Sequence, residues 1–226
     1  RVESLGLLAS GIANDFNNML TGILGNVELA LEDVAATHPA RPCLEDVALA
    51  ARTASEITAQ LLTFAGRRRM ERDELELNDV ITGSLERIER VYPGAAIIKM
   101  DLTPDLPQLL GDRALLNEAV DQLAMNAMQA FGGVPGPLRV RTWLEEDGRV
   151  ALEIADGGPG LDDLTRERAF EPYYTTRETG RGLGLAIVQG IVFQHGASVE
   201  LDTAPGQGAC FTIRFSRLAH GAIPIP

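Results

Sequence analysis

Apolar positions along the first 64 residues recur at the three-and-four spacing of amphipathic helices. This spacing predicts one long helix over residues 5–34 and a second over residues 44–64, and the prolines of His38-Pro39 and Arg41-Pro42 separate them. A hairpin of about 70 residues with one apolar stripe per helix buries little surface by itself. We therefore expect residues 1–72 to be a dimerisation domain that forms a four-helix bundle with a second copy.

After Asp73 the pattern changes to short β-prone runs separated by helices, glycines and prolines. Helices are expected at 78–92, 113–131 and 182–195, with Asn78 and Asp112 as the N-caps of the first two. Because the strands and helices do not alternate regularly, the pattern indicates an α+β domain over 73–226, with helices on one face of a mixed sheet. The predicted strands are 74–77, 96–102, 138–145, 149–155, 198–202 and 211–216.

Composition and charge exclude several classes of protein. The chain has 226 residues, of which 45% are hydrophobic, so a core forms without disulfides or metals. A net charge of −12 disfavours nucleic acid and anionic lipid as partners. The two cysteines, Cys43 and Cys210, lie in no metal-binding pattern, and no apolar run is long enough to cross a membrane. We expect a cytoplasmic fragment of a longer protein, without membrane insertion.

Three clusters that bear polar residues or glycines follow one another in the second domain. Asn126 lies late in a predicted helix, where Gln122 and Gln129 share its strip of the surface. A carboxamide oxygen suits Mg²⁺ that phosphates already hold, although a helix-edge Asn without a role explains this residue equally well. Asp156 ends a predicted strand and precedes a glycine-rich turn. Its carboxylate can accept a hydrogen bond from the amine of adenine, and the alternative is an ordinary Asp-Gly turn.

The third cluster, Gly180-Arg181-Gly182-Leu183-Gly184-Leu185, opens the last predicted helix. Free N–H groups at a helix start favour an anion such as a polyphosphate, whereas the plain alternative is a flexible loop. Residues 161–179 form a connection of roughly 20 residues without a strand pattern, which we interpret as a nucleotide lid. Within and after it, Arg177 or Arg181 is placed to meet phosphate oxygens, and the alternative for each is a solvated surface arginine.

Together these clusters resemble the histidine-kinase branch of the GHKL ATPases over nearly the full chain. The run Ala9-Ser10-Gly11-Ile12-Ala13-Asn14-Asp15-Phe16-Asn17-Asn18 is similar to that family's phosphoacceptor box, often read as His-Asp-Phe-Asn-Asn. The resemblance implies a histidine-phosphotransfer hairpin over 1–72, followed by a GHKL-type α/β sandwich that binds ATP over 73–226. It further implies a sensor histidine kinase that is a homodimer, uses ATP and Mg²⁺, and passes the phosphoryl group to a response-regulator receiver domain.

The family's functional residues map onto positions of this chain. The resemblance implies that Asn126 binds Mg²⁺ and Asp156 binds adenine, that Asp15 orients and deprotonates the acceptor, and that Asn18 places water for dephosphorylation of a partner. The remaining nucleotide-binding positions that it implies are Gln129, Gly158, Gly160, Arg177, Gly180, Arg181, Gly182, Leu183 and Gly184.

The acceptor position is Asn14 instead of His. A carboxamide nitrogen is delocalised into its carbonyl and is practically non-nucleophilic, so we expect the chain not to phosphorylate itself there. Two alternatives remain. The first is a response-regulator phosphatase or a non-catalytic dimeric scaffold, and the second is a GHKL-type ATP hydrolase. The hydrolase is disfavoured because Gln122 stands where such relatives carry a Glu base. His195, at the end of a predicted helix, is interpreted as interacting with the helix dipole.

Overall fold

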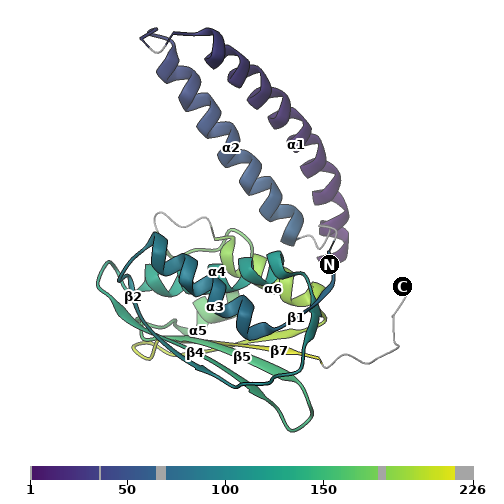
Figure 1. Ribbon diagram of the computed structural model, residues 1–226, viewed down its shortest axis with the longest axis vertical. Coiled ribbons are helices and arrows are strands. Elements are labelled where there is room, and N and C mark those ends of the chain that lie inside the picture. Colours follow the sequence, from purple (N-terminus) through teal and green to yellow (C-terminus); the bar gives the residue numbers. More distant parts are fainter. Residues whose placement is uncertain (1, 36, 65–69, 178–181, 217–226) are drawn as a thin grey trace. The chain divides into compact units, whose positions relative to one another are not determined.

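The computed structural model describes residues 2–35, 37–64, 70–177 and 182–216, with only the backbone for most positions in 2–18 and 53–64. The chain divides into two compact units, Arg1–Arg68 and Arg69–Pro226 (Figure 1). None of the helices within the described ranges combines the length and hydropathy that a membrane span requires.

The first unit is a helical hairpin, as the sequence pattern predicts. Helix α1 covers Val2–Asp33, and helix α2 covers Arg41–Phe64. Arg41 stabilises the turn, because its Nη1 donates to the carbonyls of Leu31 at 3.2 Å and Val34 at 2.8 Å. These carbonyls belong to the last turn of α1 or follow it, where helical partners are missing. Further along, an ion pair of 3.0 Å joins Arg52 to Glu28.

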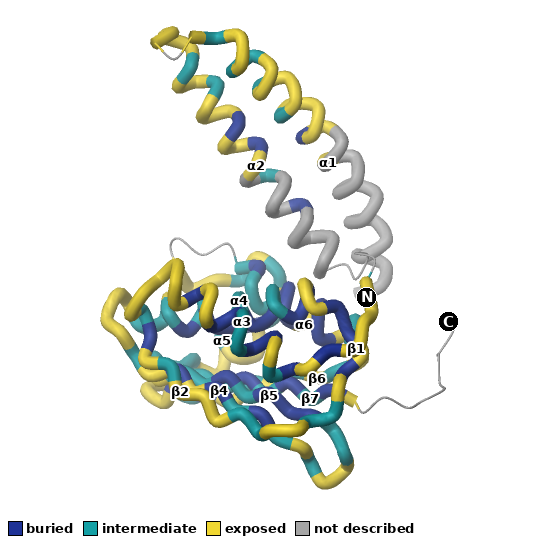
Figure 2. The backbone as a smooth tube through the Cα atoms, viewed as in Figure 1, coloured by how far each residue is buried: buried dark blue, intermediate teal, exposed yellow. Residues whose placement is uncertain are grey.

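The hairpin covers only part of its apolar surface (Figure 2). Leu20 and Ala48 are buried between the helices, whereas Phe16, Met19 and Ile23 are 52%, 56% and 43% exposed. The spacing of these three exposed residues places them on one face of α1. One hairpin therefore leaves an apolar stripe in contact with water.

The second unit contains a five-stranded mixed sheet in the order β2-β4-β5-β7-β6. Strand β2 pairs with β4 in parallel, and the other three pairs are antiparallel. The strands are β2 Ala96–Leu102, β4 Gly136–Leu144, β5 Val150–Asp156, β6 Ser198–Thr203 and β7 Ala209–Phe215. The mixed sheet and these five strands confirm the sequence prediction, with end points that differ by up to two residues.

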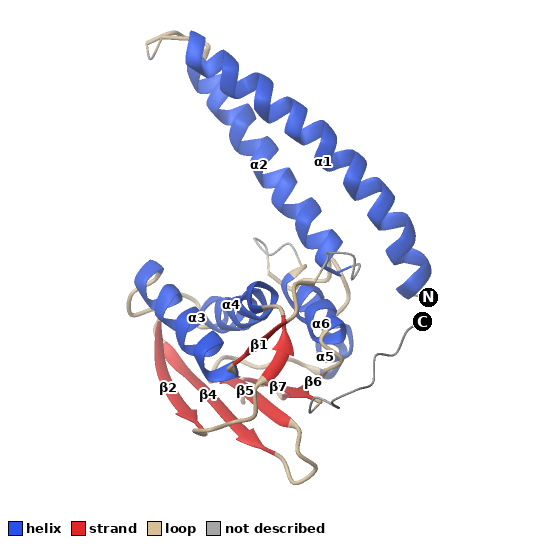
Figure 3. Cartoon of the chain, turned by 45° about the vertical axis from the view of Figure 1, so that its right-hand side comes forward, coloured by secondary structure: helices blue, strands red, loops and turns tan. Residues whose placement is uncertain are grey.

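Three helices cover one face of this sheet (Figure 3): α3 Leu77–Val91, α4 Arg113–Ala130 and α6 Gly184–Gln194. The core lies between the two layers, and its largest side chains include Leu123 of α4, Ile191 of α6 and Leu152 of β5. Alternate residues of the strands point to the opposite face, where Arg139 pairs with Glu153 at 3.0 Å. An α/β sandwich results, with one apolar and one polar sheet face.

The structure adds to or differs from the local sequence signals at three places in this unit. Asn78 does not cap α3, because it lies inside the helix and its amide bonds to other elements. Its Nδ2 donates to the Thr103 carbonyl, and its Oδ1 accepts from the hydroxyl of Thr142 in β4. The strand expected at 74–77 is present as β1 Asp73–Leu75, but it lies outside the mixed sheet and pairs with an unpredicted strand, β3 Leu109–Gly111, in a separate two-stranded sheet. The connection 161–179 contains the short helix α5 Asp163–Arg168.

The Asp112 N-cap prediction is confirmed, and this residue also holds the chain that enters the unit. Its Oδ1 accepts from the N–H groups of Ala114 and Leu115, and its Oδ2 accepts from the N–H of Glu71. The N–H of Asp112 in turn donates to Nε2 of His195 at 3.0 Å. One carboxylate thus fixes both the start of α4 and the segment before β1.

His195 links the end of α6 to the start of α4. Because Nε2 accepts from Asp112, the ring proton lies on Nδ1, which donates to the Ile191 carbonyl at 2.7 Å. Burial lowers the pKa of His195, and the Ile191 carbonyl and the Asp112 charge only partly oppose this effect. The imidazole therefore acts mainly as a neutral bridge, and the expected interaction of a charged ring with the helix dipole is a minor part of its role.

We predict that the free energy of unfolding falls as the pH drops below about 6.5, the ordinary His value. The unfolded chain takes up a proton there before folded His195 does, so acid favours unfolding. Denaturant titrations at pH 7.5 and 5.5 measure this. The variant His195→Gln should be less stable by about 1 kcal/mol at pH 7.5, and it should lose less stability on acidification. An equal loss in both proteins would contradict the role of His195.

Candidate nucleotide site

The three polar clusters of the sequence meet at one end of the sandwich. A Cβ added at Gly158 would lie 3.0 Å from the Cβ of Ala130, so the loop after β5 touches the end of α4. A Cβ added at Gly184 would lie 2.8 Å from Oε1 of Gln122 and 3.7 Å from Nδ2 of Asn126. The start of α6 therefore faces the same part of α4. Segments far apart in the chain converge on the Asn126 strip.

Asp156, the last residue of β5, fixes the loop that follows it. Its Oδ1 accepts from the N–H of Gly158 at 2.8 Å and from the N–H of Ala209 at 3.3 Å. Burial raises the pKa of Asp156, while these two N–H groups and the charge of Arg177 lower it. Among the described residues no hydrogen bond reaches Oδ2. This oxygen is therefore available to accept from an exocyclic amine.

Backbone contacts close the floor of this site. Gly160 and Gly208 have φ values of +68° and +76°, and a Cβ on either would overlap a carbonyl oxygen, that of Ala204 or Asp156 respectively. The N–H of Gly206 donates to the carbonyl of Pro159 at 2.6 Å. Gly160 is one of the nucleotide-binding positions that the resemblance implies, and in the structure its missing side chain makes room for a neighbouring carbonyl. Gly208 was missed, although a Gly three positions before the predicted strand 211–216 is a signal for it.

Asn126 and Gln129 lie one turn apart on α4 and present oxygens to the same group. Oδ1 of Asn126 and Oε1 of Gln129 both accept from Nη1 of Arg177, at 3.3 and 2.6 Å, and Nη2 of Arg177 donates to the Asn126 carbonyl at 3.1 Å. The other end of the Asn126 amide, Nδ2, is buried and makes no hydrogen bond within the described structure. A cation is thus held by neutral oxygens, which are ligands that also suit Mg²⁺.

The segment before Arg177 is anchored to α5. The guanidinium of Arg168 lies 4.1 Å from the centre of the Tyr174 ring, a cation–π contact. Tyr173 has a φ of +64°, which is strained for a residue with a large side chain, and its N–H donates to the Gly182 carbonyl at 2.8 Å. Gly182 itself packs against the backbone of these two tyrosines. None of these anchors was predicted from the sequence.

The other predicted site residues fall into three groups. Leu183 is 4% exposed, so its side chain belongs to the core. Gly180 and Arg181 lie outside the described residues. Asn14, Asp15 and Asn18 lie on α1, and the structure describes only their backbone.

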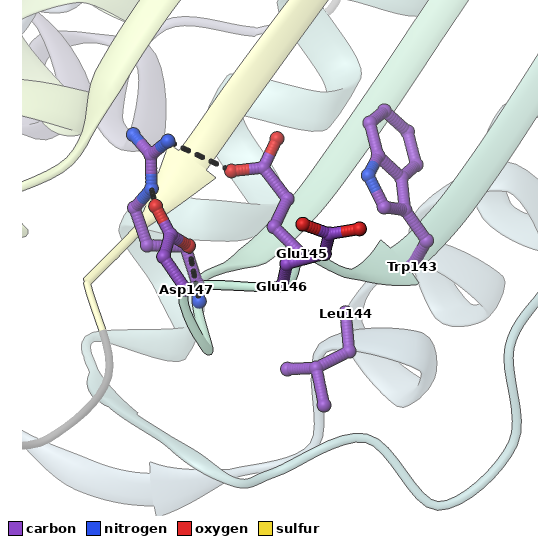
Figure 4. A pocket seen from close by; sticks show the side chains of 6 residues that line it. Trp143, Leu144, Glu145, Glu146 and Asp147 are labelled. Carbon is purple, nitrogen blue, oxygen red and sulfur yellow. Dashed lines mark hydrogen bonds and ion pairs between the residues drawn. The ribbon is translucent and has the colours of Figure 1, made fainter.

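A different pocket, of about 510 Å³, opens beside the turn between β4 and β5 (Figure 4). Trp143, Glu145 and Arg149 are among its lining residues. It lies at the Val150 end of β5, whereas Asp156 ends that strand. Six residue steps of about 3.3 Å separate the two ends by roughly 20 Å. This pocket is therefore separate from the site at Asp156.

Comparison with known proteins agrees with this geometry. Residues 111–219 match the family described as histidine kinase-, DNA gyrase B- and HSP90-like ATPase. The sensor histidine kinase ZraS of Klebsiella oxytoca is 32% identical over 94% of this chain and 46% of its own length. The sensor kinase CckA of Brucella abortus is 32% identical over 96% of this chain and 25% of its own length. The chain thus spans less than half of these relatives.

Among solved structures, the chain is similar to full-length ShkA in complex with AMPPNP. The match covers 92% of this chain and 45% of the ShkA chain, with a TM-score of 0.76 and 25% sequence identity. The mycobacterial sensor histidine kinase MprB covers 64% of this chain and 97% of its own, with a TM-score of 0.57 and 30% identity. The chain has the architecture of a sensor histidine kinase core. A helical hairpin precedes an ATPase domain of the histidine kinase type, as the resemblance in the sequence implied.

We predict that closure of the floor at Gly208 is essential to this ATPase domain. The variant Gly206→Ala, at φ +79° with open space around it, should lose about 1 kcal/mol of unfolding free energy from backbone strain alone. The variant Gly208→Ala should lose about 1–3 kcal/mol more, because its Cβ overlaps the Asp156 carbonyl. Urea denaturation compares the two. Equal losses would show that the overlap is relieved without loss of stability.

Proposed function

We propose that this chain binds Mg²⁺-ATP in its ATPase domain and serves as the kinase core of a two-component system, with a response-regulator receiver domain as partner. The observation that supports this most is the convergence of Asp156, Asn126 and the start of α6 at one end of the sandwich. This convergence brings three features together: a site for a base, a site for a cation, and a helix N-terminus that favours anions. ATP has all three complementary parts.

Each part of the nucleotide is assigned to particular residues. Oδ2 of Asp156 accepts from the amine of adenine, and Oδ1 keeps the loop of Gly158 in place. Oδ1 of Asn126 is the protein ligand for Mg²⁺, which neutralises phosphate charge when bound. The N–H groups at the start of α6 and the guanidinium of Arg177 bind phosphate oxygens. Gly180, Arg181 and Gly182 belong to the same phosphate-binding segment in this proposal.

The hairpin is proposed to carry the acceptor position on α1. In a chain with His there, Asp15 would orient the imidazole and Asn18 would place water for dephosphorylation of the partner. With Asn14, the nucleophile is missing, and we propose that this chain is deficient in autophosphorylation. The ATPase domain is unaffected by that replacement, because Asn14 and the nucleotide site belong to different units.

Dimerisation through the hairpin is the second part of the proposal. The stripe of Phe16, Met19 and Ile23 is about half exposed on α1. Pairing with the same stripe of a second copy would bury it and produce a four-helix bundle. Rapid ATP hydrolysis is not expected, because Gln122 has no carboxylate to serve as a base beside Asn126.

We predict that Asn126→Asp weakens binding of a non-hydrolysable Mg²⁺-ATP analogue by at least about tenfold. The aspartate carboxylate would place a second oxygen at the buried position that Nδ2 occupies in the parent chain. Its negative charge would also hold Arg177 more tightly than the amide does, so that Arg177 blocks the cation. Calorimetry measures the affinity. The matched control is Asn117→Asp, on the same helix, where Oδ1 accepts from Ser84 and a carboxylate can do the same. Similar affinities for both variants would remove Asn126 from the site.

We predict that Asn14→His restores acid-labile label from γ-labelled ATP, because an imidazole nitrogen can attack the phosphoryl group. The parent chain with Asn14 should remain unlabelled under the same conditions. The double variant Asn14→His with Asn126→Asp is the control for the nucleotide site. Label on the parent chain, or none on Asn14→His, would contradict the assignment of position 14.

A further inference from the structure

The guanidinium of Arg177 lies at the point of α4 where a cation is expected. Three oxygens surround it, from the side chains of Gln129 and Asn126 and from the Asn126 carbonyl, at 2.6, 3.3 and 3.1 Å. We name Arg177, Asn126 and Gln129 the Arg177 cluster. These contacts link residues about 50 positions apart and join Arg177, near the end of the segment 161–179, to α4.

The Arg177 cluster fixes the orientation of the Asn126 amide. If Oδ1 and Nδ2 were exchanged, two donors, Nδ2 and Nη1, would face each other. Oδ1 therefore points to the guanidinium, and Nδ2 takes the buried position without a partner. The amide is thus already turned for a cation, and the oxygen proposed to bind Mg²⁺ is the one that Arg177 occupies.

Arg177 cannot stay on Oδ1 of Asn126 when a divalent cation binds there. The guanidinium and the divalent cation need the same lone pairs of Oδ1. Their positive charges would also repel each other if both were bound to this one oxygen. Burial lowers the pKa of Arg177, and the negative charge of Asp156 raises it, so the cluster holds a partly desolvated cation next to the base site. A guanidinium that leaves α4 remains close by, because the chain is anchored three residues before Arg177. The anchor is Tyr174, whose ring contacts the guanidinium of Arg168.

We propose that Arg177 is a built-in competitor of Mg²⁺ and that Gln129 is the positioning residue that holds it on Asn126 in the nucleotide-free protein. Binding of the Mg²⁺-nucleotide displaces Arg177 from Oδ1, and its guanidinium becomes free to contact phosphate oxygens. This inference rests on the proposed nucleotide site and changes the role of Gln129 within it. In this role Gln129 weakens nucleotide binding. A residue that contacted the metal or the nucleotide directly would strengthen it.

Competition of this kind multiplies the apparent affinity by the fraction of molecules in which Arg177 is off Asn126, so a smaller fraction means weaker binding. Gln129 makes the shortest bond to Arg177, and its side chain is exposed on the helix. The variant Gln129→Ala should therefore tighten binding of the non-hydrolysable Mg²⁺-ATP analogue by roughly three- to tenfold, the range for one exposed charge-assisted hydrogen bond. A residue that contacted the metal or phosphate would have the opposite effect.

Calorimetric titration of the full chain and four variants tests this. Gln129→Ala should bind the analogue more tightly than the parent, and Gln189→Ala, an exposed glutamine on α6, should match the parent. In the Arg177→Ala background, Gln129→Ala should have no effect, because there is no guanidinium left to hold. Alanine favours helix at position 129, so circular dichroism should show an intact fold.

The outcomes separate the two proposals. Weaker or unchanged binding by Gln129→Ala, or tightening that persists without Arg177, would overturn the competition while leaving the nucleotide site in place. A parent chain that binds no analogue, although folded, would overturn the nucleotide site and the competition together.

Discussion

The site depends on one carboxylate at the end of a central strand. Asp156 pairs with Ala209 in the sheet, and its side chain also accepts from the N–H groups of Ala209 and Gly158. The carbonyl of the same residue leaves no room for a Cβ at Gly208. Because sheet pairing and loop closure use the same residue, the position of the carboxylate that is proposed to bind the base is set by the rigid part of the domain.

Helix α4 carries two functions on adjacent strips. Its buried strip, which includes Leu115 and Leu123, contacts the sheet and the other helices. The neighbouring strip presents Asn126 and Gln129 to Arg177. A helix turns by about 100° per residue, so a packing strip and a binding strip can lie side by side without interfering. Packing of the core thus fixes the direction in which the polar strip faces, while contacts with Arg177 orient its amide oxygens.

The two units separate nucleotide binding from the acceptor. The nucleotide site lies wholly in the second unit, and position 14 lies in the hairpin. In the proposed function, a replacement at position 14 therefore lies outside the unit that binds the nucleotide. The exposed stripe of Phe16, Met19 and Ile23 also belongs to the hairpin.

The sequence by itself determined the helical hairpin, the five strands of the mixed sheet and the order of the polar clusters, because these depend on local periodicity and turn residues. It also determined the Asp112 cap, which is a local interaction. Only the tertiary structure decided that Asn78 bonds to Thr142, that His195 accepts from Asp112, and that Arg177 contacts Asn126. These partners are 51 to 83 residues apart. Such contacts arise when the folded layers bring side chains together, and no local pattern along the chain encodes them.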